Sequence, residues 1–286
     1  MCGPQTRRAI LQTRRFPTRT MRGDGRVLFG GHVTSSEDVV FLISHGFDFG
    51  EVVLRDGLET RHFKDLAASL YHNTSFFLIA HGPSEGPPND LEHLWQIYYP
   101  KLMRTLEIAE QLDIHFLTVH LWFDPRFVRP HVCEEKLKFM EEISHAATPH
   151  GILISLENLS ENASDLALVV QRVPNISLTL DVGHGQLLAE RNTSYEIVNK
   201  LYQWIGHVHL HDNYGGNSVK DDLHLPIGSG RVEIQHILLN LIEKGYRGTA
   251  TLELKPHELE SSLNTVRGMI AGFGRLRCAQ GVELSH

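Results

Sequence analysis

The 286-residue chain is long enough for one large domain or two small ones, and its hydrophobic and charged fractions, 41% and 21%, are those of an ordinary globular protein. No apolar run approaches the roughly 20 residues that a membrane-spanning helix needs, and the first residues lack the apolar core of a secretory signal. These features exclude a membrane-spanning protein and favour a cytoplasmic one.

The first 23 residues differ from the rest of the chain in charge, because they carry six arginines and no acidic residue. Removing those six positive charges from the formal net charge of −7 leaves −13 for the remainder. An acidic body is a poor electrostatic match to nucleic acid. We interpret residues 1–25 as a disordered extension or as sequence upstream of a true start at Met21, and residues 26–286 as the folded domain. A nucleic-acid arm and an organellar transit peptide are the alternatives for the extension.

From Arg26 onward, short β-branched or aromatic runs alternate with longer segments of helical periodicity, the pattern of repeated βα units. Eight strands are predicted, at Val27–Phe29, Phe49–Leu54, Phe76–Ala80, Phe116–Val119, Ile152–Leu156, Ser177–Leu180, Ile205–Leu210 and Thr249–Leu254. Eight helices are predicted, at Glu37–His45, Thr60–Tyr71, Leu91–Leu112, Glu134–Thr148, Asp165–Arg172, Tyr195–Trp204, Ile234–Lys244 and Ser261–Arg275. Ser35 and Ser164 are the expected caps of two of them. The count favours an α/β fold, a single-domain (β/α)₈ TIM barrel.

Polar side chains end six consecutive predicted strands. They are His81 in FFLIAH, His120 in FLTVH, Glu157 in ILISLE, Asp181 in SLTLD, His209 in HVHL and Glu253 in TATLELK. The first two strands offer no such residue by this criterion. In a TIM barrel the carboxyl ends of the strands form one shared mouth, so these six side chains should meet. Burying several carboxylates together is costly without a cation, which predicts a divalent-metal site.

Three further polar groups lie in loops beside the strand ends. His184 follows Asp181 in LDVGHG, and Asp222 and His224 alternate in DDLHLPIGSG. Oxygen and imidazole ligands without thiolates suit Zn²⁺, Mn²⁺, Co²⁺ or Fe²⁺, and the sequence does not choose among these metals. The Gly/Pro-rich segment HGPSEGPPND after the third strand is interpreted as an active-site loop.

The motifs IAHGP, AEQLDIHFLTVH, LISLENL, LTLDVGH, HVHLHDN, DLHLPIGSG and LELK, in this order, resemble the xylose isomerase-like TIM-barrel superfamily. That superfamily includes sugar isomerases and epimerases, inosose dehydratases and AP endonucleases of the endonuclease IV type. The resemblance to the isomerases implies one Mn²⁺, Co²⁺ or similar ion held by Glu157, Asp181, His209 and Glu253. It also implies that Glu157 and Glu253 move a proton to and from a carbon next to a carbonyl, and that His184 touches a substrate oxygen.

The endonuclease IV branch implies a different chemistry, in which three Zn²⁺ ions hydrolyse a phosphodiester. Its nine ligands have counterparts in His81, His120, Glu157, Asp181, His184, His209, Asp222, His224 and Glu253. Two departures weigh against this branch: the chain has Val182 and Gly183 where those enzymes have Thr and Cys, and His211 where the family usually has Asn.

The leading interpretation is therefore a divalent-metal-dependent isomerase or epimerase of a small sugar or sugar-like polyol, with the zinc-dependent AP endonuclease as the alternative. A lyase, a dehydratase or a binding protein on the same site is a third class. His211, Lys255 and Trp122 are further candidates for substrate contact, each with packing or solvation as the alternative role. A small sugar is the expected partner, and the chain could form a homo-oligomer. The sequence determines neither which sugar is the substrate nor whether that sugar is phosphorylated.

Overall fold

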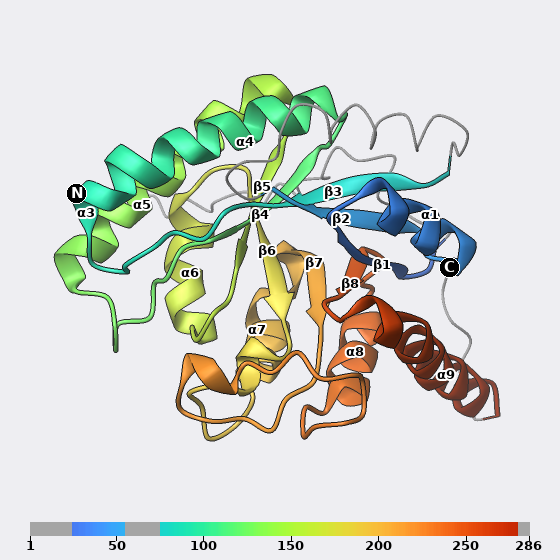
Figure 1. Ribbon diagram of the computed structural model, residues 1–286. Coiled ribbons are helices and arrows are strands. Elements are labelled where there is room, and N and C mark those ends of the chain that lie inside the picture. Colours follow the sequence, from blue (N-terminus) through green and yellow to red (C-terminus); the bar gives the residue numbers. More distant parts are fainter. Residues whose placement is uncertain (1–24, 55–74, 280–286) are drawn as a thin grey trace, which may run out of the picture.

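The computed structural model describes residues 25–54 and 75–279, and eight parallel strands close into a barrel in which each strand neighbours the next along the chain (Figure 1). The predicted fold class is confirmed. The strands are β1 (Leu28–Val33), β2 (Phe49–Val53), β3 (Phe77–His81), β4 (Phe116–His120), β5 (Leu153–Glu157), β6 (Ile176–Asp181), β7 (Ile205–Leu210) and β8 (Thr249–Leu252).

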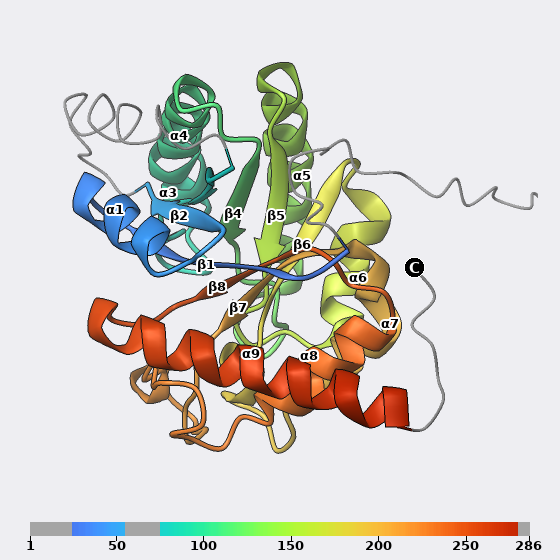
Figure 2. The same ribbon diagram turned by 90° about the vertical axis from the view of Figure 1, so that its right-hand side faces the viewer.

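Helices cover the outside of the barrel. They are α1 (Ser36–Ser44), α3 (Leu91–His93), α4 (Tyr99–Gln111), α5 (Pro130–Ala147), α6 (Ala163–Arg172), α7 (Ser194–Leu201), α8 (Ile234–Glu243) and α9 (Pro256–Ala279), with short 3₁₀ turns between some of them. Figure 1 shows α4 and α5 side by side, and Figure 2 shows α9 running along the outside past α8. The predicted helix Thr60–Tyr71 lies outside the described residues, as does nearly all of the proposed extension. Among the helices of residues 25–54 and 75–279, none is both long enough and apolar enough to cross a bilayer.

Helix starts follow the capping rules with one correction. Ser35 caps α1, and the Asp38 carboxylate accepts the Ser35 backbone N–H in return. The prediction that Ser164 caps α6 is wrong. Asn162 is the cap: its backbone is extended, and its side-chain oxygen accepts the backbone N–H of Asp165. The carboxylate of Asp165 then accepts from the Asn162 backbone, so the capping box starts two residues earlier than the sequence suggested.

The segment predicted as one helix, Leu91–Leu112, contains a π-helical turn over Leu94–Tyr98 between α3 and α4. The backbone N–H of Tyr99 donates to the carbonyl of Leu94, five residues earlier. Pro100 follows at once and has no N–H to donate, which favours this local shift of the hydrogen-bond ladder. The turn carries Tyr98 inward, and its hydroxyl donates to the carbonyl of His120 at 2.8 Å. The π-helical turn thus anchors the end of β4.

The barrel interior changes from apolar to polar along the strands. At the amino-terminal end, Leu28, Phe49, Ile79 and Phe116 form a cluster separate from the larger core between strands and helices. Hydroxyl groups come next, where Thr179 Oγ1 lies 3.0 Å from Thr118 Oγ1. Side chains alternate between the two faces of a strand, so every second residue enters the interior. The layer at the carboxyl ends therefore consists of imidazoles and carboxylates.

Candidate metal centre

Four of the predicted ligands converge at the carboxyl ends of β5 to β8. Glu157 and Asp181 are the last residues of β5 and β6, His209 lies one residue before the end of β7, and Glu253 follows β8. The Nδ1 atom of His209 lies 3.3 Å from Glu157 Oε1, 3.7 Å from Asp181 Oδ2 and 3.4 Å from Glu253 Oε1. All four side chains are buried, and one ligand atom from each lies within 4.8 Å of the others. We call them the strand-end cluster.

The strand-end cluster fits a divalent cation. His209 Nδ1 and Glu157 Oε1 are buried and have no hydrogen-bond partner. Three buried carboxylates that face one imidazole repel one another and have lost their water, both of which a bound cation would offset. One nitrogen and several oxygens are a donor set that Zn²⁺, Mn²⁺ and Co²⁺ all accept. Metal ligation by these residues remains a prediction, which the geometry supports.

His81 and His120 flank the other oxygen of Glu157. Their Nε2 atoms lie 3.2 Å and 2.8 Å from Glu157 Oε2, with the two rings perpendicular. Burial alone lowers the pKa of His81, but the hydrogen bond and charge of Glu157 outweigh it and raise that pKa to about 9. Burial raises the pKa of Glu157, whereas His120 and His209 hold it well below its usual range. Glu157 is therefore a carboxylate shared by several imidazoles.

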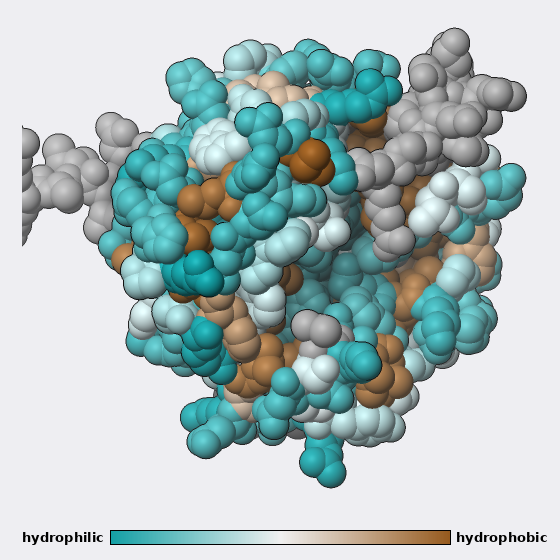
Figure 3. Space-filling view, turned by 60° about the vertical axis from the view of Figure 1, so that its left-hand side comes forward, coloured by the Kyte–Doolittle hydropathy of each residue, from teal (hydrophilic) through white to brown (hydrophobic). Residues whose placement is uncertain are grey.

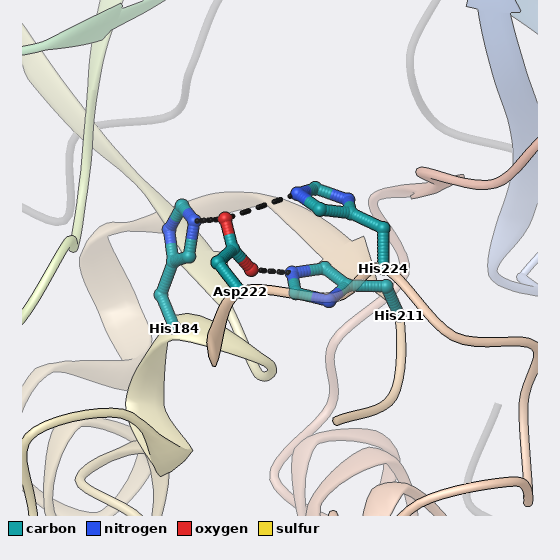
Figure 4. Close-up of side chains that lie close together, drawn as sticks. All are labelled: His184, His211, Asp222 and His224. Atoms are coloured by element: carbon teal, nitrogen blue, oxygen red, sulfur yellow. Dashed lines mark hydrogen bonds and ion pairs between the residues drawn. The ribbon is translucent and has the colours of Figure 1, made fainter. Parts of the chain in front are cut away.

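The loop residues form a second group beside the first, drawn in Figure 4. Asp222 Oδ2 lies 3.2 Å from His184 Nε2 and 3.1 Å from His224 Nε2. His211 Nε2 lies 3.8 Å from Asp222 Oδ1 and 3.1 Å from Asp181 Oδ1, so His211 links the two groups. The Asp222 Oδ1 atom is buried without a hydrogen-bond partner. We call His184, His211, Asp222 and His224 the loop cluster, a second set of donors for a cation.

His224 completes the loop cluster from a backbone that side chains rarely adopt. Its φ angle of +46° lies in the left-handed region, which costs a non-glycine residue on the order of 1 kcal/mol or more. Burial alone lowers the pKa of His224, but the hydrogen bond to Asp222 and the nearby charges raise it to about 9. Such a costly conformation is retained mostly where a side chain must be held in one place.

The expectation that the first two strands contribute no polar group is wrong. β1 extends to Val33 and brings His32 to the mouth, where its Nε2 atom lies 2.9 Å from Glu253 Oε1. β2 brings in Glu51, which is fully buried beneath His209. The rule that looked for polar residues at strand ends missed both. The alternation of inward side chains along β2, counted from Phe49, could have found Glu51.

Two predicted substrate contacts, Lys255 and Trp122, make no hydrogen bond or ion pair with either cluster in the part of the chain that the structure describes. Lys255 is exposed at the start of α9, where its backbone N–H donates to Glu258. Trp122 is half-buried after β4, its indole N–H donates to Ser160 Oγ at 2.7 Å, and its ring stacks on Phe127. His211 is buried and contacts Asp181. The roles of all three in substrate binding remain predictions.

The mouth is accessible from one side. The side chains of His120, Asp222, His32 and His224 are 24%, 22%, 31% and 37% exposed, while Asp181 and His209 beneath them are inaccessible. Figure 3 shows a hollow in one face of the molecule whose interior is mainly hydrophilic, with hydrophilic and hydrophobic residues at its rim. A ligand reaching the strand-end cluster would meet imidazoles and carboxylates, which suits a molecule rich in hydroxyl groups more than an apolar one.

Comparison with known proteins agrees with this geometry. Residues 40–274 match the family model described as xylose isomerase-like TIM barrel. An uncharacterized protein of Methanocaldococcus jannaschii is 27% identical over 239 residues, 78% of this chain and 79% of that protein. An inosose isomerase of Halalkalibacterium halodurans is 24% identical over 159 residues, 52% of this chain and 56% of that enzyme. The crystal structure of a D-tagatose 3-epimerase-like protein has a TM-score of 0.70 at 26% identity, covering 85% of this chain and 100% of the other.

Proposed function

The chain belongs to the xylose isomerase-like TIM barrel family, and from this premise we propose that it is a divalent-metal-dependent isomerase or epimerase of a small sugar or sugar-like polyol. The observation that carries the proposal is the pair Glu157 and Glu253, which come from β5 and from the end of β8 and both face His209 Nδ1. The similarity to an inosose isomerase and to a D-tagatose 3-epimerase-like protein supports the same class of reaction.

The two glutamates are suited to proton transfer. Burial opposes their ionisation, yet His209 and the neighbouring His120 and His32 hold the pKa of Glu157 and of Glu253 well below the usual range, so both are carboxylates at neutral pH. One carboxylate removes a proton from a carbon next to the substrate carbonyl; the other glutamate takes up a proton from solvent and delivers it to the opposite face, which inverts that carbon, and the first glutamate then releases its proton to solvent. A divalent cation held by Glu157, Asp181, His209 and Glu253 would supply polarisation of the substrate oxygens.

Groups around the mouth are suited to hold a polyol. His184 belongs to the loop cluster and also contacts the strand-end cluster: its Nε2 atom lies 3.2 Å from Asp222 Oδ2 and its Nδ1 atom 3.1 Å from Glu157 Oε1. We assign it a hydrogen bond to a substrate oxygen. Trp122 offers a ring fixed by Ser160 and Phe127, against which the apolar face of a sugar can pack. Lys255 has an exposed ammonium group that a substrate hydroxyl or phosphate could recruit.

The test of this function is incorporation of solvent deuterium into a carbon-bound position of ketoses and inososes. The metal-free protein is loaded separately with Mn²⁺, Co²⁺ or Zn²⁺ in D₂O, and the sugars are analysed by NMR. We expect deuterium in at least one substrate, and none with Glu253→Gln. Absence of exchange across a wide panel with every metal, from protein shown to bind the metal, would contradict proton transfer next to a carbonyl.

The loop cluster favours one second candidate, a multi-zinc phosphodiester hydrolase of the endonuclease IV kind. His184, Asp222 and His224 bring three donors together next to the strand-end cluster, as a site for several cations needs. Cleavage of DNA that contains an abasic site, assayed with Zn²⁺-loaded protein at low salt, distinguishes the two functions. Binding to such DNA should weaken steeply with salt if phosphates are contacted.

A further inference from the structure

Glu51 occupies an unusual position inside the barrel. It lies on β2 two residues after Phe49, and its side chain is fully buried between two histidines of β7. Its Oε2 atom lies 3.3 Å from His207 Nε2, and its Oε1 atom lies 3.2 Å from His209 Nε2. No other buried carboxylate that the structure describes is held between two imidazoles of one strand in this way.

The contact with Glu51 determines which nitrogen of His209 faces the strand-end cluster as an acceptor. An ionised carboxylate only accepts hydrogen bonds, so the proton on this side belongs to Nε2 of His209. In the neutral imidazole, the Nδ1 atom then keeps its lone pair, directed to the other side. That atom has no hydrogen-bond partner and faces carboxylate oxygens of Glu157 and Glu253 at 3.3 Å and 3.4 Å.

We propose that Glu51 is a positioning residue for the metal centre: it accepts the Nε2–H of His209, fixes the ring, and so presents the lone pair of Nδ1 to a divalent cation. This inference rests on the proposed function, because it concerns the same metal site. Glu51 touches none of the reacting atoms and acts through His209 alone. Carboxylates that orient a metal-binding histidine in this manner contribute about 10- to 100-fold to metal affinity in other proteins.

The surroundings of Glu51 support a positioning role over simple packing. His207 holds Glu51 from the other side and is itself held by Thr249, whose Oγ1 atom lies 2.7 Å from His207 Nδ1. Phe49, two residues before Glu51, lies in the apolar cluster, and an apolar side chain at position 51 would avoid the desolvation cost of a buried carboxylate. A carboxylate here therefore serves a purpose other than filling the barrel.

The inference is tested with three variants of the whole chain. Glu51→Leu removes the acceptor at similar volume, and Glu51→Gln keeps an acceptor oxygen without the charge. Thr249→Val is the matched control, because it disturbs the contact on the far side of His207 and leaves Glu51 and His209 untouched. The Zn²⁺ dissociation constant is measured by competition with a chromophoric chelator, and the Tm of each metal-free protein by circular dichroism. NMR of histidine-labelled, Zn²⁺-loaded wild type gives the protonated nitrogen of His209.

We expect zinc affinity to fall about 100-fold in Glu51→Leu and about 10-fold in Glu51→Gln, and to stay within about twofold of wild type in Thr249→Val. His209 should carry its proton on Nε2. If the Glu51 variants lower only the Tm and bind zinc as tightly as wild type, or if Thr249→Val weakens zinc as much as they do, Glu51 is a structural residue and the inference is wrong. If Glu51→Leu does not fold, the zinc affinity of Glu51→Gln alone tests the inference. Failure of wild type to bind any divalent metal would instead overturn the proposed function.

Discussion

Gly183 lies directly against the ring of His211, and a Cβ atom at position 183 would overlap three atoms of that ring. Gly183 in LDVGHG is a position at which the chain departs from the AP endonucleases, and His211 in HVHLHDN is one at which it departs from the family's usual Asn. The structure joins them into one feature, because the missing side chain at 183 is the space that the imidazole at 211 fills. His211 in turn contacts Asp181 at 3.1 Å and stacks on His224.

The first prediction concerns this contact. Gly183→Ala should displace His211 and weaken cation binding by the loop cluster more than by the strand-end cluster. Isothermal titration with Zn²⁺ on the metal-free protein measures both. Gly268→Ala in α9 is the control, since no atom lies within 4 Å of a Cβ there, and it should leave metal binding unchanged and stability equal or about 0.5–1 kcal/mol higher. Unchanged binding in Gly183→Ala would contradict a role for His211.

The second prediction concerns the two candidate proton-transfer groups. Glu157→Gln and Glu253→Gln should each lower kcat by about 100-fold or more. The metal-free protein should still fold, with a lower Tm, because each substitution keeps the side-chain volume but removes the charge partner of buried imidazoles. Glu92→Gln on the exposed surface of α3 is the control and should behave as wild type. The role assigned to the pair fails if both variants retain full turnover with metal bound.

The third prediction concerns a buried ion pair between Lys136 on α5 and Glu85 in the loop after β3. Lys136 Nζ binds Glu85 Oε1 and donates to the Trp122 carbonyl, and both charged side chains are buried. Burial raises the pKa of Glu85 and lowers that of Lys136 in spite of their attraction, so the pair is costly to keep dry. Lys136→Met should lower the free energy of unfolding by about 3–5 kcal/mol, because it leaves Glu85 buried without a partner.

Adding Glu85→Gln to Lys136→Met should recover part of the lost free energy of unfolding. Urea unfolding curves of the single and double variants measure this recovery. A double variant as unstable as the single one would mean that the lysine acts through its packing alone. Because Glu85 accepts the backbone N–H of Trp122 and Lys136 donates to its carbonyl, both variants should raise the KM for the proposed sugar substrate.

The fourth prediction is a pH dependence of opposite sign in the metal-free and metal-loaded proteins. His81 and His224 have folded pKa values raised to about 9. Their contribution to stability without metal is therefore full below an unfolded value of about 6.5 and is lost as pH rises to about 9. Metal ligands must be deprotonated, so zinc affinity should rise over the same interval. Melting curves from pH 6.5 to 9, with EDTA and with Zn²⁺, test this; parallel curves would count against it.

The fold could be predicted from the sequence because strands and helices alternate regularly along it. The six strand-end residues could also be predicted, because each of them ends an apolar run. His32 was missed because the predicted first strand ended at Phe29, before Gly30 and Gly31. In the structure both glycines lie within β1. Residue 30 is a glycine because the ring of Phe49 occupies the space where a side chain would lie. Glu51 was missed because it sits within a strand. Glu51 matters because it lies 3.2 Å from His209 in the folded chain, and the two residues are 158 positions apart in the sequence.

The most direct measurement is the metal content per chain of protein purified without added metal or chelator, for wild type and Asp181→Asn. Asp181 is buried in the strand-end cluster and offers a ligand oxygen in the grouping of Glu157, Asp181, His209 and Glu253. We predict about one tightly held divalent ion in wild type and its loss in the variant. About three zinc ions per chain would contradict a single-metal isomerase and favour the phosphodiester hydrolase. A wild-type protein that neither contains nor takes up a divalent ion would contradict the proposed metal-dependent function.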